Sequence, residues 1–383
     1  MAEPPHVGRT SFPRPATPYE DYMAAQAVPI HRGHTGFSDV RTLELGDWAR
    51  LGARGAFIEL EGVGNVQGTY LLGIDGGAAT LPERHVFEEV IFVVEGRGQT
   101  EVWVDGSRRD CVRWGPNSVL SVPMNAWHRH VADPGEAALL LAGTNAPIAM
   151  QLYCNQDFVF DNDFVFEDRY RPGSDFFVPS PLKVHPMNGR ALNSDAFIPD
   201  ATKVEIPLDG QRGAGYHHFE LQMAGNFYDG WVGEYPTGRY SKAHAHESGP
   251  ILVCLAGAGY TLSWPKSAGV RPWETGHGDL VVRTDYGPGG VVSAAPGGAD
   301  WFHAHFGVSR EPFRAMALSG GIPKRVKGKP GDEVSENQDM REGGDTIGYA
   351  DEDPQIREIF KTALAASGAT FDMPDALFQR DEG

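Results

Sequence analysis

The chain has 383 residues and a formal net charge of −18, a charge that disfavours binding to nucleic acid or to an anionic membrane. Hydrophobic residues make up 41% of the sequence, which is enough for one or two cores and excludes a wholly disordered chain. The 48 glycines and 28 prolines are scattered without a period, which excludes collagen and favours a turn-rich, mainly β protein.

The sequence contains neither a membrane-spanning nor a secretory pattern. No stretch reaches the roughly 18 consecutive apolar residues that span a bilayer, and the N-terminus lacks an apolar run before a cleavage site. The three cysteines, Cys111, Cys154 and Cys254, are far apart and odd in number, as expected in a reducing compartment. We therefore expect a cytoplasmic protein with neither a membrane nor a nucleic acid as partner.

Short strands are expected from residue 39 onward. In the first half of the chain, β-branched or aromatic runs bounded by Gly, Pro, Asn or Asp lie at 63–74, 88–104, 118–131 and 137–147. In the second half, similar runs lie at 203–208, 217–225, 231–246, 250–264, 278–286, 289–298, 301–308 and 313–320. Strands separated by tight turns at this spacing are typical of a sandwich or a barrel.

The two sets of strands resemble each other. Gly96 aligns with Gly257, and His128 aligns with His303, so an internal duplication is expected. The predicted organisation is an N-terminal arm, a first barrel, a connector, a second barrel and a C-terminal extension, over residues 1–38, 39–152, 153–202, 203–320 and 321–383 respectively. The aromatic and acidic connector is interpreted as a strand or loop packed between the barrels.

One helix is predicted in the C-terminal extension. Asp353 is placed to cap its N-terminus, Pro354 suits its first turn, and Gly368 ends it. Apolar side chains recur at helical spacing on one face, at Ile356, Ile359, Phe360, Ala363 and Leu364. We expect this face to cover one of the barrels.

Histidines in the second repeat form a candidate metal site. His244 and His246 are two residues apart in a predicted strand, so both imidazoles point to the same side. His303, on a later strand, is the third candidate ligand. Imidazole suits Fe, Zn, Cu and Ni, and three ligands leave positions open for substrate and for oxygen or water.

These residues resemble the two motifs of the cupin superfamily. Gly238, His244, His246 and Gly257 match the first motif, in which Pro250 stands where the family has Glu. The second motif is matched, with two extra residues before its histidine and without the family Asn, by Gly290, Pro296 and His303.

The first repeat matches the same motifs with other departures. Its first motif is matched by Gly77, His85, Glu89 and Gly96, and its second by Pro123 and His128. Glu83 stands where the first motif has its first His, and its carboxylate is a candidate for a fourth ligand. Two His and a carboxylate are a legitimate metal set, as in facial-triad iron sites.

The resemblance covers about residues 40–320 and implies a bicupin, an all-β protein with two tandem jelly-roll barrels and a metal pocket in each. The three-His set is similar to that of ring-cleaving dioxygenases of the gentisate and salicylate type, which hold Fe(II) with three His, usually in their first cupin. It implies a main metal site at His244, His246 and His303 and a secondary one at His85, Glu89 and His128. The implied metal is Fe(II), with Zn, Mn or Ni as alternatives, and a homodimer or higher homo-oligomer is expected.

Other side chains are candidates for roles beside the metal. His130 and His305 follow the motif histidines by two residues, so strand alternation directs them inward as hydrogen-bond donors or acid–base groups. Arg283 lies on a predicted strand, where a guanidinium can pair with a substrate carboxylate, and Tyr260 lies on another strand of the same barrel. The catalytic candidates are His305, Arg283 and Tyr260.

Three functions fit these residues. The first is an Fe(II) dioxygenase that binds a small aromatic or enolic acid through two oxygens and cleaves a C–C bond. The second is a redox-neutral isomerase, lyase or decarboxylase that uses Zn, Mn or Ni as a Lewis acid. The third is a bicupin that binds a small molecule without catalysis. We favour the first, because a neutral three-His site leaves charge for a chelating dianionic substrate.

Overall fold

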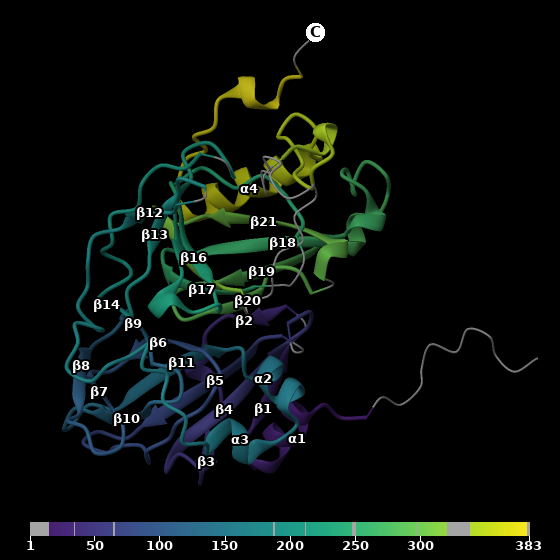
Figure 1. Cartoon of the computed structure of the whole chain (residues 1–383). Coiled ribbons are helices and arrows are strands. Elements are labelled where there is room, and N and C mark those ends of the chain that lie inside the picture. Colours follow the sequence, from purple (N-terminus) through teal and green to yellow (C-terminus); the bar gives the residue numbers. More distant parts are fainter. Residues whose placement is uncertain are drawn as a thin grey trace, which may run out of the picture.

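The computed structural model describes residues 15–33, 35–63, 66–186, 188–210, 212–246, 250–296, 298–319 and 338–380. In this part of the chain two β-barrels, each made of one large and one small sheet, are stacked on each other (Figure 1). Barrel 1, the lower one in this view, comes mainly from the first half of the chain, and barrel 2 comes mainly from the second half. The expected fold class, mainly β with two tandem barrels, is therefore confirmed.

Barrel 1 closes a large sheet against a small one. Its strands are β1 Ile30–Gly33, β3 Gly46–Trp48, β4 Ala53–Leu60, β5 Gly68–Ile74, β6 Glu89–Glu95, β7 Gly98–Trp103, β8 Asp110–Trp114, β9 Val119–Ser121, β10 Trp127–Ala132, β11 Ala138–Thr144 and β14 Phe197–Ile198. The large sheet has the order β1-β4-β5-β11-β6-β9-β14, with β3 paired to β4 beside this path. The small sheet has the order β10-β7-β8.

Barrel 2 repeats this arrangement. Its strands are β2 Gly36–Phe37, β12 Lys183–Val184, β13 Ala191–Asn193, β15 His217–Leu221, β16 Gly230–Tyr235, β17 Ile251–Ala256, β18 Gly259–Pro265, β19 Val282–Tyr286, β20 Val291–Ser293, β21 Trp301–Gly307 and β22 Phe313–Leu318. The large sheet has the order β12-β13-β15-β16-β22-β17-β20-β2, and the small sheet has the order β19-β18-β21. The matching orders support the internal duplication expected from the sequence.

Each large sheet ends in a strand from the other half of the chain. Strand β14 pairs with β9 at the edge of barrel 1, and β2 pairs with β20 at the edge of barrel 2. Such pairing covers a sheet edge that would otherwise expose unpaired backbone groups. The segments predicted as arm and connector thus supply strands to both barrels, and they tie the two barrels together.

Three helices lie together on the lower right of barrel 1 in Figure 1, namely α1 Pro18–Ala25, α2 Ala146–Tyr153 and α3 Gln156–Phe160. The sequence did not predict α1, although Thr17 and Glu20 form a capping box at its start. Tyr19, Tyr22 and Met23 of α1 are buried in the core of barrel 1. Helix α1 of the N-terminal arm is therefore folded onto barrel 1, while residues 1–14 lie outside the described residues.

The two large sheets pack face to face. Their contact is a hydrophobic core to which barrel 1 contributes Leu71, Val90 and Phe92 and barrel 2 contributes Phe219 and Val232. Alternate residues of the same strands point the other way, into the interior of each barrel. Burial on both faces explains why the strands of the large sheets are almost continuously apolar.

The predicted C-terminal helix is confirmed as α4 Pro354–Ser367, capped by Asp353 and ended by Gly368 in the left-handed conformation. Its Ile356, Phe360 and Leu364 pack on the outer face of the small sheet of barrel 2, as expected. Figure 1 shows α4 above β21 and β18. The expected boundary between barrel 2 and the C-terminal extension, at residues 320 and 321, lies within residues 320–337, which are outside the described residues.

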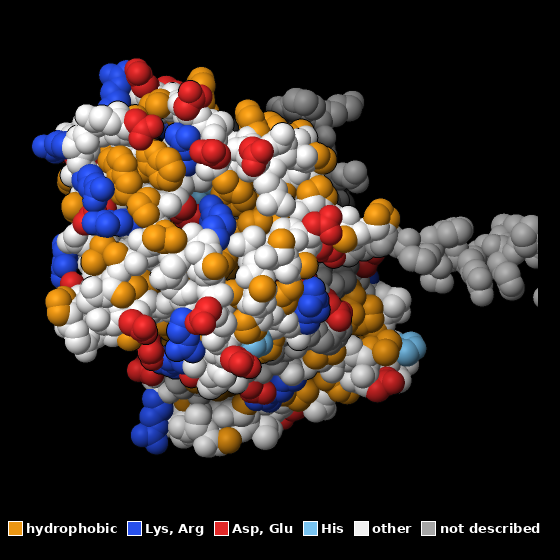
Figure 2. Space-filling model, turned by 90° about the horizontal axis from the view of Figure 1, so that it is seen from below, with side chains coloured by type: hydrophobic (Ala, Val, Ile, Leu, Met, Phe, Trp, Pro, Cys, Tyr) orange, Lys and Arg blue, Asp and Glu red, His pale blue; other side chains and the backbone are white. Residues whose placement is uncertain are grey.

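Short 3₁₀ helices occupy the connections, at η1 Val40–Thr42, η2 Met223–Gly225, η3 Lys266–Ala268, η4 Gly278–Leu280, η5 Gly298–Asp300, η6 Met340–Glu342 and η7 Asp375–Phe378. Among the helices of the described residues, none has both the length and the apolar character needed to cross a bilayer. On the face shown in Figure 2, acidic and basic side chains intermingle.

Candidate metal centres

Three histidines converge inside barrel 2. His244 and His246 lie between β16 and β17, and His303 lies on β21. The backbone holds two of them side by side, because His244 N donates to His303 O at 2.9 Å and His303 N donates to His244 O at 2.8 Å. One ligand atom of each imidazole lies within 4.8 Å of the others. Donors bound to a single ion by bonds of about 2 Å lie at most about 4 Å apart, so small side-chain shifts would bring these atoms around one ion.

The donor atoms of this set fit a bound transition metal ion. His244 Nδ1 contacts Lys242 O at 3.0 Å, which places the proton on Nδ1 and the lone pair on Nε2. His244 Nε2 and both ring nitrogens of His303 are buried and have no hydrogen-bond partner among the described residues. Because buried polar atoms are normally paired, these atoms are suited to a ligand role.

A buried arginine makes the barrel 2 site electropositive. Burial, with smaller contributions from nearby cationic groups including Arg212, lowers the pKa values of His244 and His303 well below the usual range. Arg212 is 5% exposed, and its guanidinium lies 5.3 Å from the ring centroid of Trp231. Neutral imidazoles do not offset the charge of a divalent ion, so this site favours an anionic ligand.

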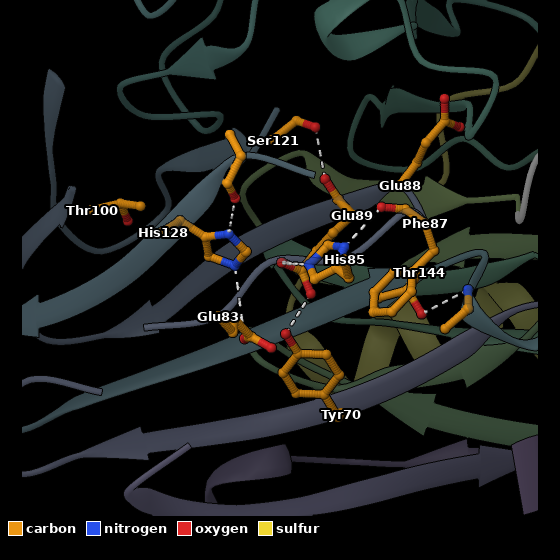
Figure 3. A network of polar contacts seen from close by, with 12 residues as sticks. Tyr70, Glu83, His85, Phe87, Glu88, Glu89, Thr100, Ser121, His128 and Thr144 are labelled. Atoms are coloured by element: carbon orange, nitrogen blue, oxygen red, sulfur yellow. Dashed lines mark hydrogen bonds and ion pairs between the residues drawn. The ribbon is translucent and has the colours of Figure 1, made fainter. Parts of the chain in front are cut away.

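A second set lies at the corresponding place in barrel 1 (Figure 3). His85 precedes β6, Glu89 is the first residue of β6, and His128 lies on β10. All three are buried, and their ligand atoms also lie within 4.8 Å of one another. His85 Nε2 is 3.7 Å from Glu89 Oε2, and the His85 ring stacks on Phe87 with 3.7 Å between centroids. The packing therefore fixes the ring that faces Glu89.

The donor atoms of barrel 1 also fit a bound metal ion. His85 Nδ1 contacts Phe87 O at 2.9 Å and His128 Nδ1 contacts Ala126 O at 3.1 Å, so Nε2 of each ring is the atom that would bind an ion in place of a proton. These two Nε2 atoms and Glu89 Oε2 are buried without a hydrogen-bond partner among the described residues. The other oxygen of Glu89 accepts a hydrogen bond from the Tyr70 hydroxyl, which orients the carboxylate.

Ionised carboxylates distinguish barrel 1 from barrel 2. Burial opposes the ionisation of Glu83, but Arg50 and His128 outweigh it and lower the Glu83 pKa far below its usual range. Burial likewise opposes ionisation of Glu89, and His85 outweighs it, so that the Glu89 pKa is also lowered. The donor set of barrel 1 thus includes negatively charged carboxylates, whereas His244 and His303 of barrel 2 are neutral.

A further histidine lies behind each set. His305 Nδ1 contacts Thr261 Oγ1 at 2.9 Å, and His130 Nδ1 contacts Thr100 Oγ1 at 2.8 Å. Burial is the main cause that lowers the pKa of His305 to about 3 and that of His130 to about 4. Such weak bases are poorly suited to proton transfer at neutral pH and better suited to hydrogen bonding with a ligand. For His305, this favours a hydrogen-bonding role over the predicted acid–base role.

Two of the predicted catalytic residues lie away from the histidines. His305 pairs across the small sheet with Thr261, whereas Tyr260, which precedes Thr261 on β18, points to the opposite face. Arg283 shares that outer face, because its guanidinium lies 3.8 Å from the Tyr260 ring centroid and 2.6 Å from Asp285 Oδ1. The structure therefore gives no support to catalytic roles for Tyr260 and Arg283.

Three residues that complete the sites were not predicted from the sequence. Tyr70 had a readable signal, because strand alternation places it on the same face as Leu72, toward the interior of barrel 1. Arg212 lies in a glycine-rich segment before β15, and Arg50 lies in a turn after β3. Side chains in such segments follow no period, so only the folded chain brings them to the sites.

Comparisons with known proteins give a fold similarity without a close relative. No model of a known protein family matches the chain, and no curated protein matches it. An oxalate decarboxylase from Lactobacillus farciminis in complex with formate has 11% identity and a TM-score of 0.47, over 76% of this chain and 88% of that one. A salicylate 1,2-dioxygenase from Pseudaminobacter salicylatoxidans has 13% identity and a TM-score of 0.47, over 69% of this chain and 76% of that one.

A variant of oxalate decarboxylase from Bacillus subtilis gives a similar result, with 11% identity and a TM-score of 0.46 over 76% of this chain and 78% of that one. Similarity at this level says nothing about the reaction of the present chain.

Proposed function

We propose that the chain is a metal-dependent enzyme whose barrel 2 holds Fe(II) and cleaves a small aromatic or enolic acid with dioxygen. The observation that carries this proposal is the set of three imidazoles, of which His244 and His303 are buried and neutral, within electrostatic reach of the Arg212 guanidinium. With a divalent ion bound, the site has a net positive charge in a buried environment. A substrate with a carboxylate and an adjacent hydroxyl or enol oxygen offers both the opposite charge and two chelating atoms.

The residues of barrel 2 have distinct parts in this proposal. His244, His246 and His303 would hold the ion. Bound Fe(II) would supply open positions and the redox chemistry that dioxygen requires. Arg212 would orient the substrate carboxylate through a charge-assisted hydrogen bond. His305, fixed by Thr261, would hydrogen-bond a substrate oxygen rather than remove a proton.

The buried tyrosines of barrel 2 support a polar ligand. The hydroxyls of Tyr216 and Tyr235 are buried without a hydrogen-bond partner among the described residues. Both rings belong to the core inside barrel 2, and the Tyr235 ring centroid lies 6.2 Å from that of His305. A ligand with several oxygens gives such hydroxyls the partners that buried polar groups need.

The test is metal analysis of the untagged protein, followed by oxygen uptake with gentisate-like, catechol-like and diketone acids. His244→Ala/His246→Ala removes the barrel 2 donors, and His85→Ala/His128→Ala is the matched change in barrel 1. We expect about one iron per chain in barrel 2, with iron and oxygen uptake lost only in the first variant.

Other outcomes would contradict the proposal. Oxygen uptake that survives in the barrel 2 variant would place the reaction in barrel 1. Zinc, manganese or nickel without oxygen uptake would indicate a redox-neutral isomerase, lyase or decarboxylase. Absence of any tightly bound metal would indicate a bicupin that binds a small molecule without catalysis. The expected homodimer or higher homo-oligomer stays a prediction, which sedimentation of the full chain measures.

A further inference from the structure

Glu83 occupies the position in barrel 1 that a metal-ligand candidate occupies in barrel 2. Glu83 N donates to His128 O at 3.0 Å, and His128 N donates to Glu83 O at 2.8 Å. His244 and His303 exchange the same pair of backbone bonds in barrel 2. Residues bonded in this way lie directly opposite each other, so Glu83 projects toward His128 as His244 projects toward His303.

The two carboxylate oxygens of Glu83 have different surroundings. Oε2 accepts a hydrogen bond from Arg50 Nη1 at 2.6 Å, and Oε1 lies 3.7 Å from His128 Nε2. Figure 3 shows Glu83 on the same side of the set as Tyr70, below His85 and His128. One oxygen is therefore anchored by a cation, and the other is turned toward an imidazole nitrogen that has no hydrogen-bond partner among the described residues.

Arg50 fixes Glu83 in this orientation. The Glu83 side chain is 9% exposed, and the Arg50 guanidinium carbon lies 4.0 Å from the ring centroid of Phe160. A cavity of about 20 Å³ borders this pair and is lined by Tyr22, Arg50, Tyr70, Glu83 and Phe87 among others. Such a cavity is large enough for one water molecule.

We propose that Glu83 is a fourth ligand of the barrel 1 ion, positioned by Arg50, and that it makes the two barrels select different metals. Barrel 1 then offers two imidazoles and two carboxylates, whereas barrel 2 offers three neutral imidazoles. Carboxylate oxygens suit Mn²⁺, and an all-imidazole set suits Fe, Ni or Zn. This inference concerns ion selectivity in barrel 1 and does not depend on the reaction proposed for barrel 2.

The experiment compares Mn²⁺ and Co²⁺ binding to the metal-free full chain by isothermal titration. Glu83→Gln removes the anionic oxygen, and Glu83→His reproduces the residue that stands at this position in barrel 2. We expect Glu83→Gln to weaken one Mn²⁺ site at least tenfold, and Glu83→His to lower the ratio of Mn²⁺ to Co²⁺ affinity at that site at least tenfold. The metal site of barrel 2 is the internal reference, because its ligands are unchanged in both variants.

The matched control is Glu95→Gln, which changes a half-exposed glutamate at the far end of β6. Its two Mn²⁺ affinities should equal those of the wild type within twofold. Wild-type affinities in both Glu83 variants would overturn the proposal. A crystal structure of the Mn²⁺-loaded wild type gives the test without any substitution: Glu83 Oε1 within about 2.3 Å of the ion supports a ligand role, and a distance beyond about 3 Å refutes it.

Discussion

Thr261 Oγ1 lies 2.9 Å from Nδ1 of His305, and it also contacts the Tyr286 hydroxyl at 3.1 Å. In barrel 1, Thr100 binds the inner histidine in the same manner and accepts a hydrogen bond from the Trp114 indole at 3.0 Å. All of these side chains are buried. In each barrel one threonine hydroxyl thus forms hydrogen bonds both with the histidine behind the metal set and with an aromatic side chain.

Replacing Thr261 by valine should destabilise the protein by about 1–3 kcal/mol, because His305 Nδ1 and the Tyr286 hydroxyl lose a buried partner while the shape is kept. The measurement is urea unfolding of the metal-free protein. Thr284→Val, a half-buried change directly opposite on β19, should stay within about 0.5 kcal/mol of the wild type. Equal losses in the two variants would mean that the hydroxyl contributes nothing specific.

Glu352 gives the protein a pH-dependent stability. It is buried, and desolvation outweighs the hydrogen bond from the Tyr240 hydroxyl, which raises its pKa to about 8. An unfolded glutamate ionises near about pH 4.3, so the folded state holds a proton that the unfolded state loses between these values. The contribution of Glu352 is therefore full at low pH and falls as the pH rises to about 8, by at most about 1.4 kcal/mol per pH unit.

Glu352→Gln should remove this slope, because an amide keeps the acceptor oxygen and does not ionise. The difference in unfolding free energy between variant and wild type should grow in favour of the variant from pH 5 to pH 8. Using this difference cancels the titration of the buried histidines, which is common to both proteins. Glu358→Gln, at an exposed position of α4, should show no such trend. A constant difference across this range would show that Glu352 is ionised in the folded state.

The repeated motifs made much of the site predictable, because ligand spacing on a strand is set by its period of two. His244 and His246 with His303, and His85 with Glu89 and His128, are brought together as candidate sets. Helix α4 was also predicted from its cap and apolar face. The sequence did not predict the contributions of loops, since Arg50 and Arg212 reach the sites through turns that have no period.

The same reasoning explains why the sequence could not show that Tyr260 and Arg283 face away from the histidines. Both are on predicted strands, but the period of two fixes only which residues share a face and not which face is inside. In the structure α4 covers the outer face of the small sheet, and this cover allows an aromatic side chain such as Tyr260 to be buried outside the barrel. Where a helix packs on the outside of a barrel, the apolar character of a strand residue is therefore no evidence that its side chain points into the barrel.

The pairing of β2 with β20 of barrel 2 requires a residue without a side chain at Gly36. A Cβ at this position would lie 2.3 Å from Val291 O and 2.7 Å from Val292 Cγ1. Gly36→Ala should therefore destabilise the protein by about 1–3 kcal/mol in urea unfolding and open the segment before β3 to proteolysis. At Gly287 a Cβ meets no atom of the described residues within 4 Å, so Gly287→Ala should keep wild-type behaviour. Wild-type protease resistance in Gly36→Ala would argue against tight pairing of β2.

Arg212 and Arg283 give opposite expectations for substrate binding, because one is buried beside the histidines and the other is paired with Asp285 on the outer face. The probe is 2-hydroxybenzoate, titrated calorimetrically into the Fe(II)-loaded protein without oxygen. Arg212→Met should weaken binding ten- to a hundredfold, which corresponds to the loss of about 1.5–3 kcal/mol from a charged hydrogen bond. Arg283→Met should change the affinity less than twofold. The reverse order would restore Arg283 as the residue that binds the carboxylate and would show that its side chain turns inward when substrate is present.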